Sequence, residues 1–262
     1  MDMLEDRKRA PIDLGDVLIL GLGKSGRIAA RYCLDLLGTR VRSVAIAAGA
    51  RNDDAESFAR TCTEAGALVA FDRTHIEGTY DLCIVSPGIS QFSDFYRSAQ
   101  AAAHEVVSEV EFAWRESRAE SRWVAITGTN GKTTTTALCA HLLQACGMRA
   151  TAVGNIGDTC LEAVIADATD VYVAETSSYQ LASTVDFAPN VAVMLNITPD
   201  HIKWHKTHEA YVAAKCKVMA NLGTVAGSVA VLDAVNDEVR QQVRALRGYS
   251  DEQRGFAYIP IG

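Results

Sequence analysis

Val-Ala-Ile-Thr-Gly-Thr-Asn-Gly-Lys-Thr-Thr-Thr-Thr, residues 124–136, is the stretch that decides the fold. The short apolar run 123–126 is typical of a buried strand, and the pattern over 132–146 is typical of a helix. Between them, Gly128 and Gly131 allow a turn whose backbone N–H groups point into one concavity. The helix that follows adds the partial positive charge of its N-terminus. The stretch therefore predicts a strand, a phosphate-binding loop and a helix.

Two polar side chains after the second glycine give this loop its chemistry. Lys132 can place a full positive charge beside phosphate oxygens, and the Thr133 hydroxyl can ligate magnesium. The general phosphate-loop pattern has a glycine where this chain has Ile126, so the loop is a shortened form. An ordinary strand–turn–helix is the alternative. The residues expected to bind ATP are Gly128, Thr129, Asn130, Gly131, Lys132, Thr133 and Thr134.

The composition is that of a soluble globular protein. Of the 262 residues, 48% are hydrophobic and 22% are charged, which suits a sizeable core and about two domains. The net charge is −7 without a basic tract, which argues against nucleic acid or an anionic membrane as a partner. No apolar run reaches the roughly 20 residues of a membrane span, and residues 1–10 lack the apolar core of a secretory signal. Seven cysteines without a Cys-x-x-Cys pair indicate reduced thiols, and hence a cytoplasmic protein.

A second glycine-rich turn lies near the amino terminus. The apolar run 17–20 leads into Gly21-Leu22-Gly23-Lys24-Ser25-Gly26, and a helical pattern and the apolar run 41–47 follow. This order predicts a βαβ unit whose turn binds a pyrophosphate. An NAD site would need an acidic residue at the end of the second strand, where the chain has Ala47-Ala48-Gly49. NAD binding is therefore the less favoured alternative.

Further apolar runs and helical patterns alternate along the chain, as in α/β proteins with parallel sheets. We expect more strands at 67–71, 82–85, 149–153, 171–174, 191–195 and 229–232, and more helices at 93–104, 108–117 and 207–221. The charged stretch 115–122 indicates a domain boundary. We therefore predict a Rossmann-like parallel-sheet domain over 1–121 and a P-loop ATPase α/β domain over 122–262.

Polar residues follow several of these strands at their carboxyl ends, where ligands of open α/β sheets bind. Ser86 and Gly88 follow one strand, and Glu175 ends another. A carboxylate beside a phosphate loop commonly holds magnesium against ATP. His201 follows a third strand and could equally be an ordinary loop histidine. Lys215 could equally be an ordinary cation on a helix.

Four further motifs occur in the order found in one enzyme family. They are Gly154-Asn155-Ile156-Gly157, Glu175-Thr176-Ser177-Ser178-Tyr179-Gln180-Leu181, Asn196-Ile197-Thr198-Pro199-Asp200-His201 and Tyr211-x-x-Ala214-Lys215. With the two glycine turns, this set resembles the Mur ligases, which also use the shortened phosphate loop. The Ser-Ser-Tyr-Gln-Leu stretch and the glycine-turn first domain resemble the members that add D-glutamate.

The resemblance implies an ATP-dependent ligase of peptidoglycan synthesis, and thus a role in cell-wall biogenesis, cell shape and cell division. ATP would phosphorylate the carboxylate of UDP-N-acetylmuramoyl-L-alanine, and the amine of D-glutamate would attack the acyl phosphate. Two magnesium ions and Lys132 would neutralise charge. The resemblance also implies that Lys215 is carbamylated by carbon dioxide, since a carbamate is an anionic ligand for the second ion. We expect a monomer.

The resemblance also assigns residues by role. The implied catalytic residues are Lys132, Glu175, His201 and Lys215, and the implied metal ligands are Thr133, Glu175, His201 and Lys215. The implied substrate contacts are Gly23, Lys24 and Ser25 at the UDP end, with Ser86, Gly88, Asn155, Ser177 and His201. The contact to the uridine ribose stays open, because Ala47 and Ala48 offer no carboxylate.

The chain is shorter than the ligases it resembles, which continue into a third domain that supplies D-glutamate contacts. We therefore expect a fragment with an incomplete ATPase domain, no C-terminal glutamate-binding domain and no full activity of its own. Two alternatives stay open. One is another ATP-dependent amide ligase, such as a folylpolyglutamate synthetase, and the other is a non-catalytic module that binds UDP and ATP.

Overall fold

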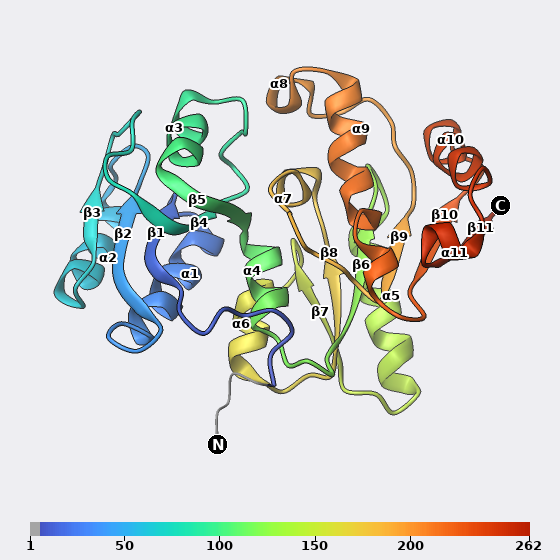
Figure 1. The fold of residues 1–262 in the computed structure, drawn as a ribbon, viewed down its shortest axis with the longest axis horizontal. Coiled ribbons are helices and arrows are strands. Elements are labelled where there is room, and N and C mark those ends of the chain that lie inside the picture. The colour runs from blue at the N-terminus through green and yellow to red at the C-terminus, as the bar shows by residue number, and fades with distance from the viewer. Residues whose placement is uncertain (1–5) are drawn as a thin grey trace.

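Two parallel β-sheets stand side by side in the computed structural model, which describes residues 6–262 (Figure 1). The first sheet has the strand order β3-β2-β1-β4-β5, and the second has the order β11-β10-β9-β6-β8-β7. Every pair of neighbouring strands is parallel. The predicted α/β class with parallel sheets is confirmed. Within the described residues, no helix combines the length and apolarity needed to cross a bilayer.

The first sheet is built by the amino-terminal part of the chain. Its elements are β1 (Gly15–Leu20), α1 (Lys24–Asp35), β2 (Val41–Ala47), α2 (Asp53–Glu64), β3 (Leu68–Ala70), β4 (Tyr80–Val85), α3 (Asp94–Ala102) and β5 (Ala103–Ser108). The central strands are apolar on both faces because helices cover both sides of the sheet. Gly26 lies where α1 crosses the sheet, and an added Cβ would stand 2.0 Å from the Gly21 carbonyl oxygen. The close crossing of helix and strand therefore requires glycine at position 26.

The second sheet follows a connecting helix, α4 (Glu109–Glu116). Its first elements are β6 (Arg122–Thr127), α5 (Lys132–Ala145), β7 (Ala150–Gly154), α6 (Cys160–Ala166), β8 (Val171–Glu175) and α7 (Ser178–Ala182). The remainder are β9 (Val191–Met194), α8 (Ile202–His205), α9 (His208–Cys216), the 3-10 turns η1 (Lys217–Met219) and η2 (Leu222–Thr224), β10 (Val229–Asp233), α10 (Asp237–Leu246), α11 (Asp251–Arg254) and β11 (Ala257–Ile261). Because β6, β8 and β9 are neighbours, their carboxyl ends meet at one edge of the sheet.

Several expected elements differ in the structure. The helix expected over 93–104 ends at Ala102, and the chain continues directly as the edge strand β5. The helix expected over 207–221 ends at Cys216 and continues as 3-10 turns. The structure also adds α2 and β11, which the sequence patterns did not indicate. Both shortened helices were extended too far because alanine-rich segments favour helix whatever their tertiary surroundings.

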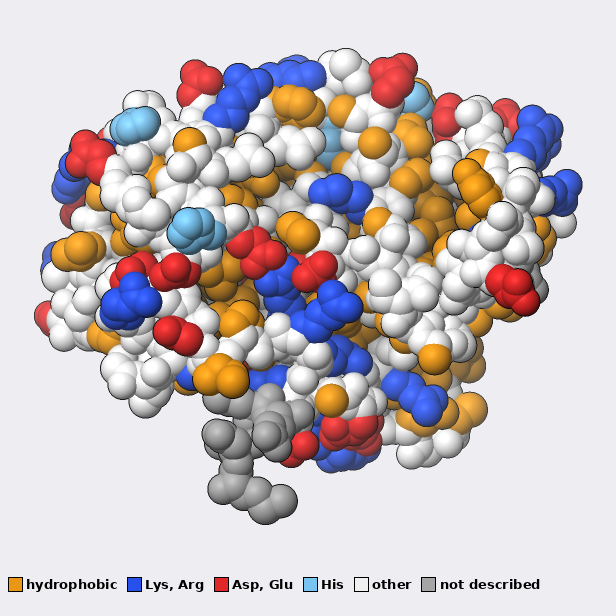
Figure 2. Space-filling view, viewed as in Figure 1, with side chains coloured by type: hydrophobic (Ala, Val, Ile, Leu, Met, Phe, Trp, Pro, Cys, Tyr) orange, Lys and Arg blue, Asp and Glu red, His pale blue; other side chains and the backbone are white. Residues whose placement is uncertain are grey.

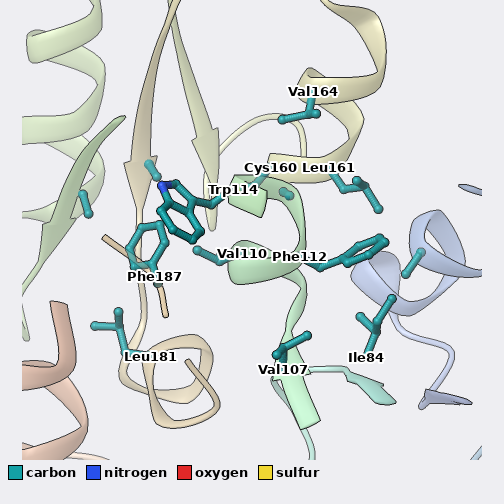
Figure 3. Close-up of a cluster of buried hydrophobic side chains, with 14 of the residues drawn as sticks. Ile84, Val107, Val110, Phe112, Trp114, Cys160, Leu161, Val164, Leu181 and Phe187 are labelled. Carbon is teal, nitrogen blue, oxygen red and sulfur yellow. The ribbon is translucent and has the colours of Figure 1, made fainter. Parts of the chain in front are cut away.

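The hydrophobic core is continuous across the junction between the sheets, and α4 lies at its centre (Figure 3). Every residue of α4 is buried. Phe112 packs edge-on against Tyr32 of α1, and Trp114 packs edge-on against Phe187 from the second part. The helix therefore belongs to the packing of both sheets.

Charged side chains fix α4 on both sides. The Glu116 carboxylate accepts hydrogen bonds from Arg40 at 2.8 Å and from Tyr32 at 2.6 Å. The Arg115 guanidinium pairs with Glu105 of β5 at 2.6 Å and lies 3.5 Å from the Asp186 carboxylate. Figure 2 shows basic and acidic side chains gathered near the centre of this face, over the junction. Packing and ion pairs together hold the two sheets in one arrangement.

Candidate active site

The phosphate loop runs from the end of β6 to the start of α5. Gly131 has φ +84°, a left-handed conformation that favours glycine. A Cβ on Gly128 would stand 3.0 Å from the Leu195 Cβ, so a side chain there would crowd the neighbouring segment. The first N–H groups of α5 lack acceptors inside the helix. The loop and the helix start therefore offer donors and positive charge to an anion.

A buried carboxylate faces this loop. Glu175 ends β8, is 1% exposed and accepts a hydrogen bond from the Thr133 hydroxyl at 2.9 Å. Its second oxygen accepts from the Asn155 side-chain amide at 3.0 Å. Within the described part of the chain, no lysine, arginine or histidine pairs with it. A buried charge with only neutral partners is costly, so this position calls for a cation.

Lys215 reaches the same loop from α9. It is 2% exposed, and its Nζ donates to the Gly128 carbonyl oxygen at 2.7 Å. Burial and the nearby Lys132 charge lower the pKa of Lys215 to about 7, although Asp200 opposes the shift. Much of the amine is therefore neutral near pH 7, which is the form that reacts with electrophiles.

His201 lies at the start of α8 in a left-handed conformation, with φ +54°. Its side chain is 44% exposed, and its Nε2 lies 3.4 Å from the Asp200 carboxylate. The ring packs against Tyr179 with centroids 4.8 Å apart. The buried His205 donates to or accepts from the Ser178 hydroxyl at 2.9 Å, and burial lowers its pKa to about 4. His205 is therefore a neutral, internal ring, whereas His201 is open to solvent.

A cavity of about 520 Å³ lies between the glycine turn after β1 and the segment after β7. Lys24 joins its two sides, because its Nζ donates to the Gly157 carbonyl oxygen at 2.8 Å and lies 3.7 Å from the Glu162 carboxylate. No aspartate or glutamate is among its lining residues within 6–262. The predicted substrate contacts that line it are Gly23, Lys24, Ser25, Ser86, Gly88 and Asn155.

Comparison with known proteins shows which family this chain resembles. Residues 126–253 match the Mur ligase middle domain. The chain is 37% identical over 229 residues to the UDP-N-acetylmuramoylalanine–D-glutamate ligase of Thermobifida fusca, covering 86% of this chain and 47% of that protein. It is 41% identical over 214 residues to the protein of the same name from Frankia casuarinae, covering 80% of this chain and 44% of that protein. The chain belongs to the Mur ligase family.

This Mur ligase chain spans about half the length of the curated relatives it matches. Among solved structures, its fold is similar to the UDP-N-acetylmuramate:L-alanyl-gamma-D-glutamyl-meso-diaminopimelate ligase from Neisseria meningitides. That similarity has a TM-score of 0.54 at 13% identity and covers 94% of this chain and 77% of the other. At this identity the likeness concerns the fold alone.

The structure of this Mur ligase brings together some of the predicted site residues and separates others. Lys132, Thr133, Glu175 and Lys215 gather at the phosphate loop. The Lys132 Nζ donates to the Thr129 carbonyl oxygen at 2.9 Å, so it curls over the loop. His201 has no hydrogen bond or ion pair to Glu175 or Lys215 within the described residues.

Ser177 is also not among the residues that line the cavity, although its partner Gln180 is. It caps α7, and its hydroxyl donates to the Gln180 side-chain oxygen at 2.9 Å while accepting from the Gln180 N–H. Its position at the start of a helix explains why serine and glutamine stand three residues apart there.

The donor set at the loop fits magnesium. Glu175 and Thr133 offer oxygen ligands, which magnesium prefers, and no lysine, arginine or histidine among residues 6–262 pairs with the Glu175 carboxyl group. One group of three acidic residues elsewhere in the described residues, Glu105, Glu111 and Asp186, has oxygens within 4.8 Å of one another. Arg115 already pairs with all three carboxylates, so a protein cation holds this acidic group together.

Two residues without a predicted role also contact the loop. The buried Tyr211 hydroxyl lies 2.8 Å from the Thr129 hydroxyl, and its ring lies 4.8 Å from the Lys215 Nζ. Asn196 bonds to the backbone of Asn130. Both stand inside motifs recognised in the sequence. Asn196 directly follows the strand expected over 191–195, which is the signal that could have singled it out.

Proposed function

We propose that this chain carries the ATP-binding and UDP-end substrate sites of a UDP-N-acetylmuramoylalanine–D-glutamate ligase. The observation that carries the proposal is the 2.9 Å hydrogen bond between Thr133, at the head of the phosphate-loop helix, and the buried Glu175. This contact places a hydroxyl, a carboxylate and the positive helix end around one point. Such a point suits the phosphates of ATP and a divalent cation.

The proposed reaction has three steps. The γ-phosphoryl group of ATP passes to the carboxylate of UDP-N-acetylmuramoyl-L-alanine, which gives an acyl phosphate and ADP. The D-glutamate amine then attacks the acyl carbon. The tetrahedral intermediate finally expels phosphate as the amide forms and the amine proton leaves. Such catalysis depends on positioning and on neutralising phosphate charge.

Named residues of this chain would share that work. The N–H groups at the start of α5 and the Lys132 ammonium would meet the phosphates. Thr133 and Glu175 would hold a first magnesium ion, which would neutralise phosphate charge when bound. A carbamate on Lys215, with His201, would supply ligands for a second ion. The neutral amine of Lys215 would form that carbamate by bonding to carbon dioxide and releasing a proton.

The substrate would extend from this loop into the cavity between the sheets. The glycine turn would receive the pyrophosphate of UDP at Gly23, Lys24 and Ser25, and Asn155 would lie between the two sites. We further propose the division into 1–121 and 122–262, a monomeric state and a cytoplasmic location, without a nucleic-acid or membrane partner.

Lys132→Ala tests the nucleotide site. We expect the variant to bind ATP in the presence of magnesium at least tenfold more weakly than the wild-type chain, because a full charge at the phosphates is lost. Isothermal titration calorimetry on this chain gives the affinity, and circular dichroism confirms folding. Lys203→Ala removes an exposed cation outside the loop and is the matched control.

Two results would count against the proposal. Equal ATP affinity in wild type and Lys132→Ala would remove the phosphate loop from the site. A wild-type chain that does not bind ATP at all would remove the nucleotide function itself.

A further inference from the structure

The backbone of the phosphate loop is bonded along one side to the segment that follows β9. The Leu195 N–H donates to the Thr127 carbonyl oxygen at 3.0 Å, and the Thr129 N–H donates to the Asn196 carbonyl oxygen at 2.8 Å. These bonds continue the parallel pairing of β6 and β9 beyond both strands. Backbone pairing stops at Asn130, where the loop turns toward α5.

At that point a side chain replaces the backbone. The Asn196 carboxamide oxygen accepts from the Asn130 N–H at 2.8 Å, and its nitrogen donates to the Asn130 carbonyl oxygen at 3.0 Å. One carboxamide thus holds the peptide groups on both sides of Asn130. Only asparagine or glutamine carries a donor and an acceptor in this arrangement.

The second of these bonds sets the direction of the next donor in the loop. The Asn130 carbonyl and the Gly131 N–H belong to one peptide group, and in a planar trans peptide they point in opposite directions. Because the carbonyl points at Asn196, the Gly131 N–H points away from it. Gly131 is exposed, and within the described residues its N–H has no hydrogen-bond partner, so this donor is available to a ligand.

We propose that Asn196 is a positioning residue that aims the Gly131 N–H at a phosphate of the bound nucleotide. The inference rests on the proposed ATP site and names a residue outside the loop that gives the loop its binding shape. Without the carboxamide, the peptide between Asn130 and Gly131 is free to turn, and the donor is no longer held in place for the ligand.

The same strand supplies a matched control. Asn190 precedes β9 as Asn196 follows it, and both side chains are half-buried. The Asn190 side-chain oxygen accepts from the Trp123 N–H at 2.9 Å, at the end of β6 that lies away from the loop. Asn190→Ala therefore removes a similar hydrogen bond between the same two segments without touching the phosphate loop.

The experiment measures ATP affinity by calorimetry and thermal stability for the wild-type chain and three variants. Asn196→Ala should weaken ATP binding about tenfold, whereas Asn190→Ala should change it less than twofold, at a comparable loss of melting temperature. Asn196→Asp keeps the acceptor for the Asn130 N–H but loses the donor to the Asn130 carbonyl. It should bind ATP at least as weakly as Asn196→Ala, because the lost donor is what orients the peptide.

The outcomes separate this inference from the proposed function. Wild-type affinity in both Asn196 variants, with ATP bound by the wild type, would overturn the positioning role and leave the nucleotide site standing. Equal weakening by Asn190→Ala and Asn196→Ala would also overturn it, since the effect would then follow general stability. Absence of ATP binding by the wild type would overturn both.

Discussion

At the scale of single residues, Glu109 at the start of α4 is a buried carboxyl that the proposed reaction does not use. Its Oε1 accepts from the Leu161 N–H at 2.6 Å, whereas its Oε2 is buried without a partner within the described residues. Burial is the main cause that raises the pKa of Glu109 to about 7. The folded protein therefore holds a proton here that the unfolded chain releases near pH 4.5.

Glu109→Gln should remove a pH dependence of stability. Between pH 4.5 and 7 the folded state binds more protons than the unfolded state, so the free energy of unfolding falls as pH rises. Glutamine keeps the shape and cannot ionise. As the pH rises from 4 to 8, the free energy of unfolding of the variant should therefore increase by roughly 3 kcal/mol relative to that of the wild type. Urea unfolding across this range measures the difference, and Glu64→Gln, at an exposed position of α2, is the control. Parallel curves for Glu109→Gln and wild type would contradict the prediction.

Lys206 has an unusual backbone conformation for a residue with a side chain. It follows α8 with φ +72° and ψ −40°. Such conformations cost of order 1–3 kcal/mol in residues other than glycine. Lys206→Gly should therefore raise the free energy of unfolding by about 1 kcal/mol, measured by urea unfolding. Lys206→Ala removes the same charge but keeps a Cβ. An equal rise in the free energy of unfolding of that variant would show that backbone strain is not the cause.

At the scale of elements, α4 carries a buried ion pair to the first sheet. Arg40 and Glu116 are almost fully buried and joined by two 2.8 Å hydrogen bonds. Glu116→Leu should cost 3–5 kcal/mol, because an uncompensated guanidinium is left inside. The double variant Arg40→Met/Glu116→Leu should cost clearly less than the sum of the single changes. Urea unfolding of a double-mutant cycle measures the coupling, and additive costs would show that the pair is not coupled.

The sequence predicted the elements whose signals are local. The apolar runs of β1, β4, β6 and β8 identified central strands, because both faces of a parallel sheet are covered. The edge strands β5 and β11 escaped detection. β5 follows α3 without a turn. β11 contains Pro260, and proline is found in edge strands of a sheet rather than in central strands.

The phosphate loop of the candidate site could be predicted from the sequence, whereas most side-chain contacts to that loop could not. The glycines and Lys132 follow from phosphate chemistry, and a carboxylate at a strand end indicated Glu175. The bonds from Asn155 to Glu175 and from Lys215 to Gly128 join residues far apart in the chain, so no local pattern specifies them. The roles of these residues stay predictions.

At the scale of the whole molecule, the cavity between the sheets predicts which nucleotide this chain prefers. UDP should bind with at least tenfold higher affinity than NAD. The cavity offers the glycine turn and Lys24 for a pyrophosphate, but none of its lining residues in the described part of the chain is a carboxylate that could hold the adenosine ribose of NAD. Calorimetry with each ligand measures the preference. Tighter binding of NAD than of UDP would favour the interpretation of the glycine turn as an NAD site.

The burial of α4 between the sheets also bears on how the protein is made. A ribosome releases α4 well before the segments that cover it, among them Leu161 and Phe187, which lie close to it in the finished core (Figure 3). Until those segments emerge, Trp114 and its neighbours have no complete apolar surroundings, although amino-terminal domains commonly fold first during synthesis. The nascent first sheet thus exposes the side that later meets the second. We therefore expect the nascent chain to be most prone to aggregation between translation of α4 and translation of residue 187.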